Sequence, residues 1–269
     1  MGTDTNVLSP RSQLQNHLAL MSNAENNEVL RRINFMDSLD DQSGWSTMKK
    51  VISATENIFF REIFHWNIKY KEDVSRGIEE MIEKFTPQFL SFVQSLEFGT
   101  ANVGPTVGLL RSLPKNFGKL KNLRKLYLNG QQIEDFEPLR SLELDFLCAE
   151  ECPITDPTPV SLKRLSWFNI DQTKIENIEF LKDSELIVMQ NVPGQLNDSK
   201  IDVLLKMPNL INFCLTINGR NFTQERIGHF IHKGSGIYEI VDKKEIKLRK
   251  MRAQKIYNSI IDYRYLDVL

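Results

Sequence analysis

Residues that could perform chemistry are few in this chain, which holds four histidines and three cysteines. His229 and His232 lie three residues apart, a spacing that would place both on one face of a helix, as metal ligands can be. No cysteine or carboxylate accompanies them at the spacing that zinc sites show. We therefore interpret the pair as part of an ordinary helix surface, and we expect no metal ion and no other cofactor.

The cysteines offer no better candidate for catalysis. A nucleophilic cysteine needs a nearby base or positive charge that lowers the pKa of its thiol. Cys148 is instead followed by Glu150 and Glu151, whose negative charges raise a thiol pKa, and Cys152 falls in the next turn. The loop GSG at residues 234–236 lacks the lysine and the preceding strand of a phosphate-binding loop. We therefore expect a protein that is not an enzyme.

A basic run, KKEIKLRKMRAQK at residues 243–255, has two interpretations. It could bind the phosphates of nucleic acid, which remains an alternative function. On a helix, however, the apolar residues of this segment would face inward while the basic ones spread over the solvated side. We favour that structural role and expect no nucleic-acid partner. The residues expected to face inward are Ile246, Leu248, Met251, Ile256, Tyr257 and Ile260.

Composition sets wider limits. The 269 residues are 41% hydrophobic and 26% charged, which is enough apolar material for one extended domain with flanking helices. The net charge of −1 gives no general attraction to nucleic acid or to anionic membranes. We find neither a membrane-spanning apolar run nor a secretory signal at the first residues, and an odd number of cysteines suits reduced thiols. A cytoplasmic protein without a membrane partner, monomeric on its own, is expected.

The elements that would position these residues follow from an internal repeat. One pattern of apolar residues, at relative positions 1, 4, 6 and 11, recurs at intervals of 21 residues. Its central copies are LRKLYLNGQQI, LDFLCAEECPI, LSWFNIDQTKI and LIVMQNVPGQL, and further copies begin at Val93 and Leu210. Such a period indicates a solenoid, in which each copy supplies a short strand and stacks on the next. The fourth positions are Leu96, Leu126, Leu147, Phe168, Met189 and Phe213.

This frame resembles the leucine-rich repeat, and the residues IEDFEPLRSL after Ile133 are similar to the short class of 21 or 22 residues found in bacterial internalins. The resemblance covers residues 93–221, near half the chain. It implies an α/β solenoid, a leucine-rich repeat arc with a parallel sheet on its concave side, used for protein recognition. The family's asparagine column, which bonds the backbone of neighbouring turns, holds Ala101, Gln131, Cys152, Thr173, Gly194 and Asn218.

Three regions are predicted: a helical N-terminal region at 1–92, about six repeats at 93–221, and a mixed α/β C-terminal cap at 222–269. Helices within residues 73–93 would cover the apolar end of the first repeat. Longer intervals leave room for helices at 104–120 and at 197–210, the second capped by Asp198 or Ser199. The C-terminal cap would contain a helix over residues 223–234, the strand IYEIV and a final helix.

The outward residues of the strands form the candidate site. Side chains alternate along a strand and neighbouring strands lie about 4.8 Å apart, so the outward residues of successive copies make one surface. Its centre would hold three aromatic rings flanked by carboxylates, a combination typical of protein interfaces. We therefore predict a module that binds a protein, as an adaptor, effector or toxin-neutralising protein. The predicted contact residues are Lys125, Tyr127, Asn129, Phe146, Cys148, Glu150, Glu151, Trp167, Asn169, Asp171 and Gln190.

One further alternative is an effector-type enzyme with its active site among the N-terminal helices. Residues 1–92 contain two histidines and no cysteine, which counts against a nucleophilic site of the kind that ligase effectors carry. Protein binding through the outward strand residues is therefore the preferred hypothesis.

Overall fold

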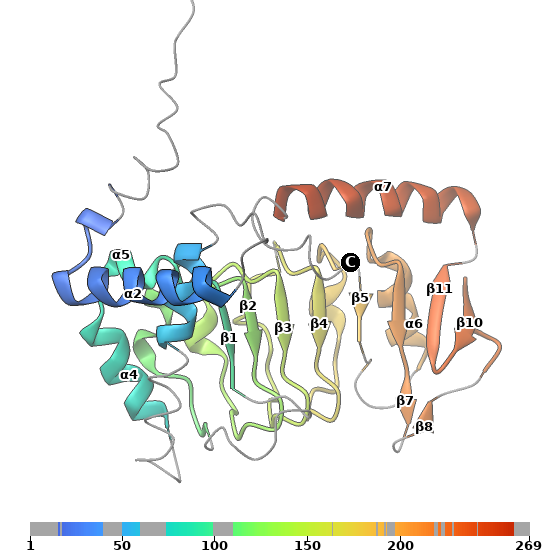
Figure 1. Cartoon of the computed structure of the whole chain (residues 1–269). Coiled ribbons are helices and arrows are strands. Elements are labelled where there is room, and N and C mark those ends of the chain that lie inside the picture. The colour runs from blue at the N-terminus through green and yellow to red at the C-terminus, as the bar shows by residue number, and fades with distance from the viewer. Residues whose placement is uncertain are drawn as a thin grey trace, which may run out of the picture.

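The computed structural model describes residues 16, 18–39, 50–59, 74–98, 110–162, 164–186, 188–190, 192, 197–217, 220–221, 224–227, 229–240 and 242–260 of the chain. Within them the fold is α/β, with helices beside an open, mixed sheet of nine strands (Figure 1). None of the described helices is long and apolar enough to cross a membrane. Across the sheet lie β1 (Ser95–Glu97), β2 (Lys125–Tyr127), β3 (Phe146–Cys148), β4 (Trp167–Asn169), β5 (Val188–Met189), β6 (Asn212–Cys214), β11 (Ile237–Ile240), β10 (Phe230–Gly234) and β9 (Arg226–Ile227).

Strands β1 to β6 are parallel and pair in the register that the repeat predicts. In every pairing, the fourth residue of one copy lies opposite the fourth residue of the next. This row is buried, with no member more than 4% exposed, and the described residues at the first and sixth positions are buried as well. The predicted inward positions are therefore confirmed for the described copies. The row consists of Leu96, Leu126, Leu147, Phe168, Met189 and Phe213.

The turn after each central strand repeats its backbone conformation too. Gly130, Glu151 and Gln172 are spaced by 21 residues and have positive φ angles of 69°, 62° and 55°. Hydrogen bonds continue the pairing into these turns, because Gly130 N donates to Glu150 O and Glu151 N donates to Asp171 O. The turns therefore stack on one another as the strands do.

Side chains of the expected asparagine column help to hold the turns together. Gln131 is buried, and its side chain accepts from Leu110 N and donates to Phe98 O, both at 2.8 Å. Cys152 Sγ donates to Leu128 O, in the preceding turn, at 3.0 Å. Residues other than asparagine thus bond neighbouring turns at two of these positions.

Short helical segments return the chain from one strand to the next. They are the 3-10 helices η1 (Lys115–Lys119), η2 (Glu137–Leu139) and η3 (Glu179–Leu181), and the helix α6 (Asp198–Lys206). The helix expected at 104–120 is only a 3-10 helix in its described part, residues 110–120. The expected cap of α6 is also wrong, because Asn197 has an extended backbone and its side chain accepts from Lys200 N at 3.0 Å.

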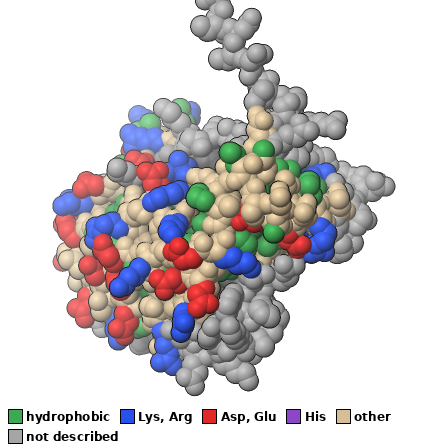
Figure 2. Space-filling model, turned by 90° about the vertical axis from the view of Figure 1, so that its left-hand side faces the viewer, with side chains coloured by type: hydrophobic (Ala, Val, Ile, Leu, Met, Phe, Trp, Pro, Cys, Tyr) green, Lys and Arg blue, Asp and Glu red, His purple; other side chains and the backbone are tan. Residues whose placement is uncertain are grey.

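Helices cover the β1 end of the sheet, as Figure 1 shows for α2 (Asn23–Leu39), α4 (Ser75–Lys84) and α5 (Pro87–Leu90). Residues 50–59 are also helical, and the Glu56 carboxylate accepts from Gln94 N and Ser95 N at 3.1 and 2.9 Å. This carboxylate therefore satisfies backbone donors at the edge strand, which would otherwise stay unpaired. Viewed from this end, Figure 2 shows acidic and basic side chains interspersed over the surface. The ion pair between Lys119 and Glu83, at 2.7 Å, joins η1 to α4.

The C-terminal region corrects one prediction. Residues 226–234, expected within a helix, instead form β9 and β10, and β10 pairs antiparallel with β11. Gly234, Ser235 and Gly236 have φ angles of 104°, 50° and 73°, so these glycines make a hairpin turn rather than a helix stop. A small two-stranded antiparallel sheet, β7 (Thr216–Ile217) with β8 (Arg220–Asn221), ends the region that was predicted to contain the repeats. The strand IYEIV and the final helix are confirmed in their described parts, β11 and α7 (Lys243–Ile260). The side chains of Ile256, Tyr257 and Ile260, expected to face inward, lie outside the described residues.

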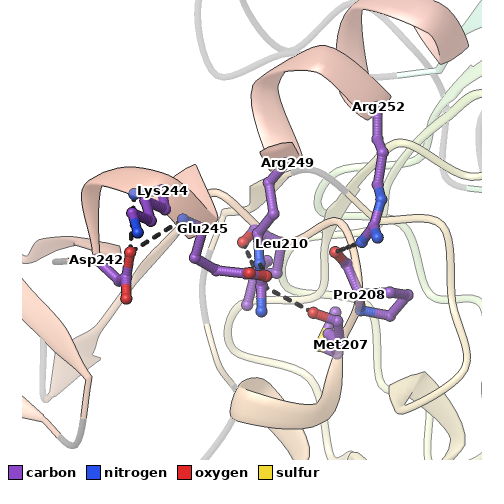
Figure 3. Close-up of polar contacts among 8 residues, drawn as sticks. All are labelled: Met207, Pro208, Leu210, Asp242, Lys244, Glu245, Arg249 and Arg252. Carbon is purple, nitrogen blue, oxygen red and sulfur yellow. Dashed lines mark hydrogen bonds and ion pairs between the residues drawn. The ribbon is translucent and has the colours of Figure 1, made fainter. Parts of the chain in front are cut away.

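The orientation of α7 corrects a second prediction. Leu248 and Met251, expected to face inward, are 43% and 62% exposed, while Arg249 is only 7% exposed. Arg249 Nη1 donates to the backbone oxygens of Met207 and Leu210 at 2.8 and 2.7 Å, and its Nε pairs with Glu245 (Figure 3). A buried guanidinium thus satisfies carbonyl groups before β6 and fixes α7 along the edge where the parallel strands begin (Figures 1 and 3).

Candidate functional site

Three aromatic rings lie side by side on the sheet face opposite the buried leucine row. Tyr127, Phe146 and Trp167, here called the aromatic ladder, come from β2, β3 and β4, and each is half-buried. The rings of Phe146 and Trp167 are stacked with centroids 3.9 Å apart and planes 5° apart. Tyr127 and Phe146 have centroids 4.7 Å apart and planes tilted by 40°. Register explains this contact, because Phe146 and Trp167 are direct partners in adjacent strands.

Two short side chains beside the ladder are less exposed than expected. Cys148 and Asn169 are each only 4% exposed, so the prediction that both present a surface is wrong. Cys148 lies outside the hydrophobic core that contains Leu147 and Ala149, which agrees with its outward position in the strand. The two residues are register partners of each other, and Tyr127 lies opposite Cys148 in the preceding strand. Cys148 and Asn169 therefore offer little area to solvent.

Carboxylates lie at the other end of the same strands. Glu150, Glu151 and Asp171, here called the acidic row, follow the buried positions of β3 and β4. Burial raises the pKa of Glu150, and the neighbouring charges of Asp171 and Glu151 raise it further. Burial is also the main reason that the pKa of Asp171 is raised. Asp171 is 9% exposed and therefore contributes charge to this face more than contact area.

Amide side chains hold the acidic row in place. Asn169 Nδ2 donates to Glu150 Oε2 at 3.2 Å, and Asn169 Oδ1 accepts from Asp171 N at 3.0 Å. Within the described part of the chain, no lysine or arginine forms an ion pair with Glu150, Glu151 or Asp171. The row therefore presents negative charge without a countercharge from these residues.

The remaining predicted residues surround these two groups. Lys125, Asn129 and Gln190 are half-buried, and Lys125 is the register partner of Phe146. Glu97 also belongs to the face, although it was not among the predicted contacts. It is exposed beside Tyr127, and its charge adds to burial in raising the pKa of the Tyr127 hydroxyl. The register between β1 and β2 is the signal that identifies it.

The cysteines are poor nucleophiles in this setting. Burial raises the pKa of Cys148, and it raises the pKa of Cys152 to about 12. Both thiols are therefore protonated at neutral pH. Among the residues that the structure describes, no group of three or more His, Cys, Asp and Glu side chains is placed to hold a metal ion. His229 and His232 do not share a helical face, because His232 lies in β10 and accepts from Gly236 N within the hairpin.

A comparison of the sequence with models of known protein families finds no match. A comparison with curated proteins finds none either. The geometry of the ladder and the acidic row is therefore what supports a functional proposal.

Proposed function

We propose that this chain is a leucine-rich repeat solenoid that binds another protein through the face carrying the aromatic ladder, without catalysing a reaction. Three features support the solenoid class: the 21-residue interval, the common register of β1 to β6, and the recurrent left-handed turn. Neighbouring strands are about 4.8 Å apart, and helical return segments need more room, so such a stack curves with its sheet inside. The ladder would then lie on a concave surface.

The stacked pair of Phe146 and Trp167 is the observation that carries the binding proposal. Both rings are half-buried on the face opposite the core, so they leave apolar area in contact with water. Aromatic side chains that stack are already held in place and lose little conformational freedom on binding. Trp167 lies between Phe146 and Val188 in neighbouring strands, and a tryptophan within such an apolar patch is of the type that dominates protein interfaces. The acidic row provides the polar rim.

Photo-cross-linking tests this proposal directly. A photoreactive phenylalanine analogue replaces Tyr127 on the face, and in a control it replaces Glu134, which is exposed after the turn that follows β2. After irradiation in an extract of the source cells, we expect a discrete covalent adduct with one protein from position 127 and none from position 134. Equal labelling from both positions, or no adduct from position 127, would contradict the proposal.

A further inference from the structure

The side of α7 that faces away from the sheet carries exposed basic and apolar side chains. Lys244, Lys247, Leu248 and Met251 follow the spacing i, i+3, i+4 and i+7, which places them on one face of the helix. All four are exposed. Two lysines beside two apolar side chains, here called the outer face of α7, form the kind of stripe with which a helix docks into an apolar and charged surface.

This stripe is complementary to the face that carries the ladder. The ladder offers half-exposed rings, and the acidic row offers carboxylates without an ion pair to any described lysine or arginine. Leu248 and Met251 could pack on the rings while the two lysines neutralise the carboxylates. We infer that the outer face of α7 of one molecule binds the ladder and acidic row of a second copy. This inference rests on the proposed function and names the partner protein as the chain itself.

The dimensions of the two surfaces agree. Phe146 begins β3 and Glu150 follows two residues after its end, so four residues separate them, at most about 13 Å if the chain stays extended. On α7, Lys244 and Met251 are seven residues apart, about 10 Å along the helix axis, and the length of a lysine side chain covers the difference. The helix would lie along the strands with its N-terminal end toward the carboxylates. Its dipole favours the same orientation, because the N-terminal end of a helix carries partial positive charge.

The contact must be made between molecules. Arg249 and Arg252 attach α7 to the backbone before β6, at the edge where the parallel strands begin (Figure 3). These arginines point toward their own domain, so the outer face of α7 points away from it. Because the four side chains of this outer face are exposed, they do not cover the ladder of their own chain. This inference departs from the monomer expected from the sequence, and it follows from the exposure of Leu248 and Met251.

The inferred contact joins the outer face of α7 on one molecule to the ladder and acidic row on another. Two variants that each lack one of these surfaces should therefore complement each other. The helix variant carries Leu248→Glu and Met251→Glu, and both positions are exposed, so the substitutions should not disturb folding. The face variant is Trp167→Ala. Each variant alone lacks one of the two surfaces, whereas a mixture of the two contains one intact helix and one intact face. The control is Leu20→Glu, at another exposed apolar position, which is 66% exposed.

Sedimentation velocity over a range of concentrations is the measurement, with far-ultraviolet circular dichroism to check folding. We expect the wild type and the Leu20→Glu control to associate, each interface variant alone to associate at least about tenfold more weakly, and an equimolar mixture to form heterodimers. A wild type that stays monomeric up to its solubility limit would overturn the inference. So would a helix variant that associates normally, or a mixture that forms no heterodimer.

The result also separates this inference from the proposed function. If position 127 cross-links to a different protein and the wild type is monomeric, the face binds a protein and self-association is wrong. An adduct at position 127 that is a dimer of this chain supports both. If position 127 forms no adduct, the proposed function fails. If the Trp167→Ala variant also self-associates as the wild type does in sedimentation velocity, the contact inferred between copies is wrong as well.

Discussion

Replacing Leu147 with alanine should destabilise the protein by roughly 3 kcal/mol, within the usual range of about 2–5 kcal/mol for a buried leucine. Leu147 is 0% exposed and lies between its register partners Leu126 and Phe168, which adjacent strands hold in place. These neighbours cannot collapse into the space that the substitution leaves, so a cavity remains. Trp167→Ala removes a larger side chain, but the indole is half-buried on the opposite face. Its loss should remove about 0.5–1.5 kcal/mol of stacking with Phe146 and part of the ring's burial, but it leaves no enclosed cavity, so we expect a smaller total than for Leu147→Ala.

Urea unfolding of the wild type and both variants measures this difference. With a denaturant dependence of about 3 kcal/mol per molar urea, Leu147→Ala should lower the midpoint by about 1 M, and Trp167→Ala should lower it by less. Far-ultraviolet circular dichroism of the native baselines checks that all three proteins fold. If Trp167→Ala destabilises as much as Leu147→Ala, the ring belongs to the core, and its assignment to a binding face is wrong. A loss below about 0.5 kcal/mol for Leu147→Ala would refute the alignment of the repeat.

Three other substitutions test separate parts of the structure. Glu151→Gly should stabilise the protein by about 1 kcal/mol in thermal unfolding, because Glu151 has a φ of 62°, a conformation that costs a non-glycine residue energy. Arg249→Met should leave the carbonyl groups of Met207 and Leu210 without their donor, and hydrogen exchange of α7 should become markedly faster while exchange of β2 to β4 is unchanged. Glu150→Gln should raise stability at neutral pH and leave it unchanged well below about pH 4, the ordinary pKa of a carboxyl. The sign follows because the pKa of Glu150 is raised in the folded state, so the folded protein binds this proton more tightly than the unfolded chain does. The wild type therefore loses stability as the pH rises from the pKa of the unfolded chain through the pKa of the folded protein. Urea midpoints of the wild type and Glu150→Gln at the two pH values measure this effect, with Glu134→Gln as the exposed control. Equal changes of the midpoint in Glu150→Gln and Glu134→Gln would contradict the expectation.

The parts of the fold that could be predicted are those encoded by a local pattern that recurs. The apolar frame determines which residues face the core, and equal spacing aligns Leu126, Leu147 and Phe168 in neighbouring strands. It also places the aromatic ladder, because a residue next to an inward position must point outward in a strand. Chain order alone therefore predicted the direct contact between the β3 and β4 rings.

The features that could not be predicted depend on contacts between distant segments. A basic helix with apolar residues normally buries the apolar ones, but the carbonyl groups of Met207 and Leu210 need a donor, and Arg249 provides it. Nothing within residues 243–255 indicates that requirement. The segment that forms β9 and β10 was mistaken for a helix because apolar residues at short intervals suit either structure, and Gly234 ends a helix as readily as it forms a turn.

Burial within the candidate face likewise depends on lateral neighbours. Cys148 and Asn169 occupy outward positions as predicted, yet each is only 4% exposed. They are register partners of each other, and Tyr127 lies opposite Cys148. The arrangement across strands decides their burial, and the position of a residue in its own repeat does not. The proposed contact surface is therefore narrower than the eleven predicted residues suggest, and it consists mainly of the three rings, Glu150 and Glu151.

The central claim is that the aromatic ladder binds a protein, and the affinity of the partner captured at position 127 tests it most directly. Titration calorimetry would compare the wild type, Trp167→Ala and the control Glu134→Ala, which lies outside the face. We predict that Trp167→Ala weakens binding by about 2 kcal/mol or more, roughly thirtyfold, and that Glu134→Ala leaves the affinity unchanged. Normal binding by a folded Trp167→Ala variant would contradict the account.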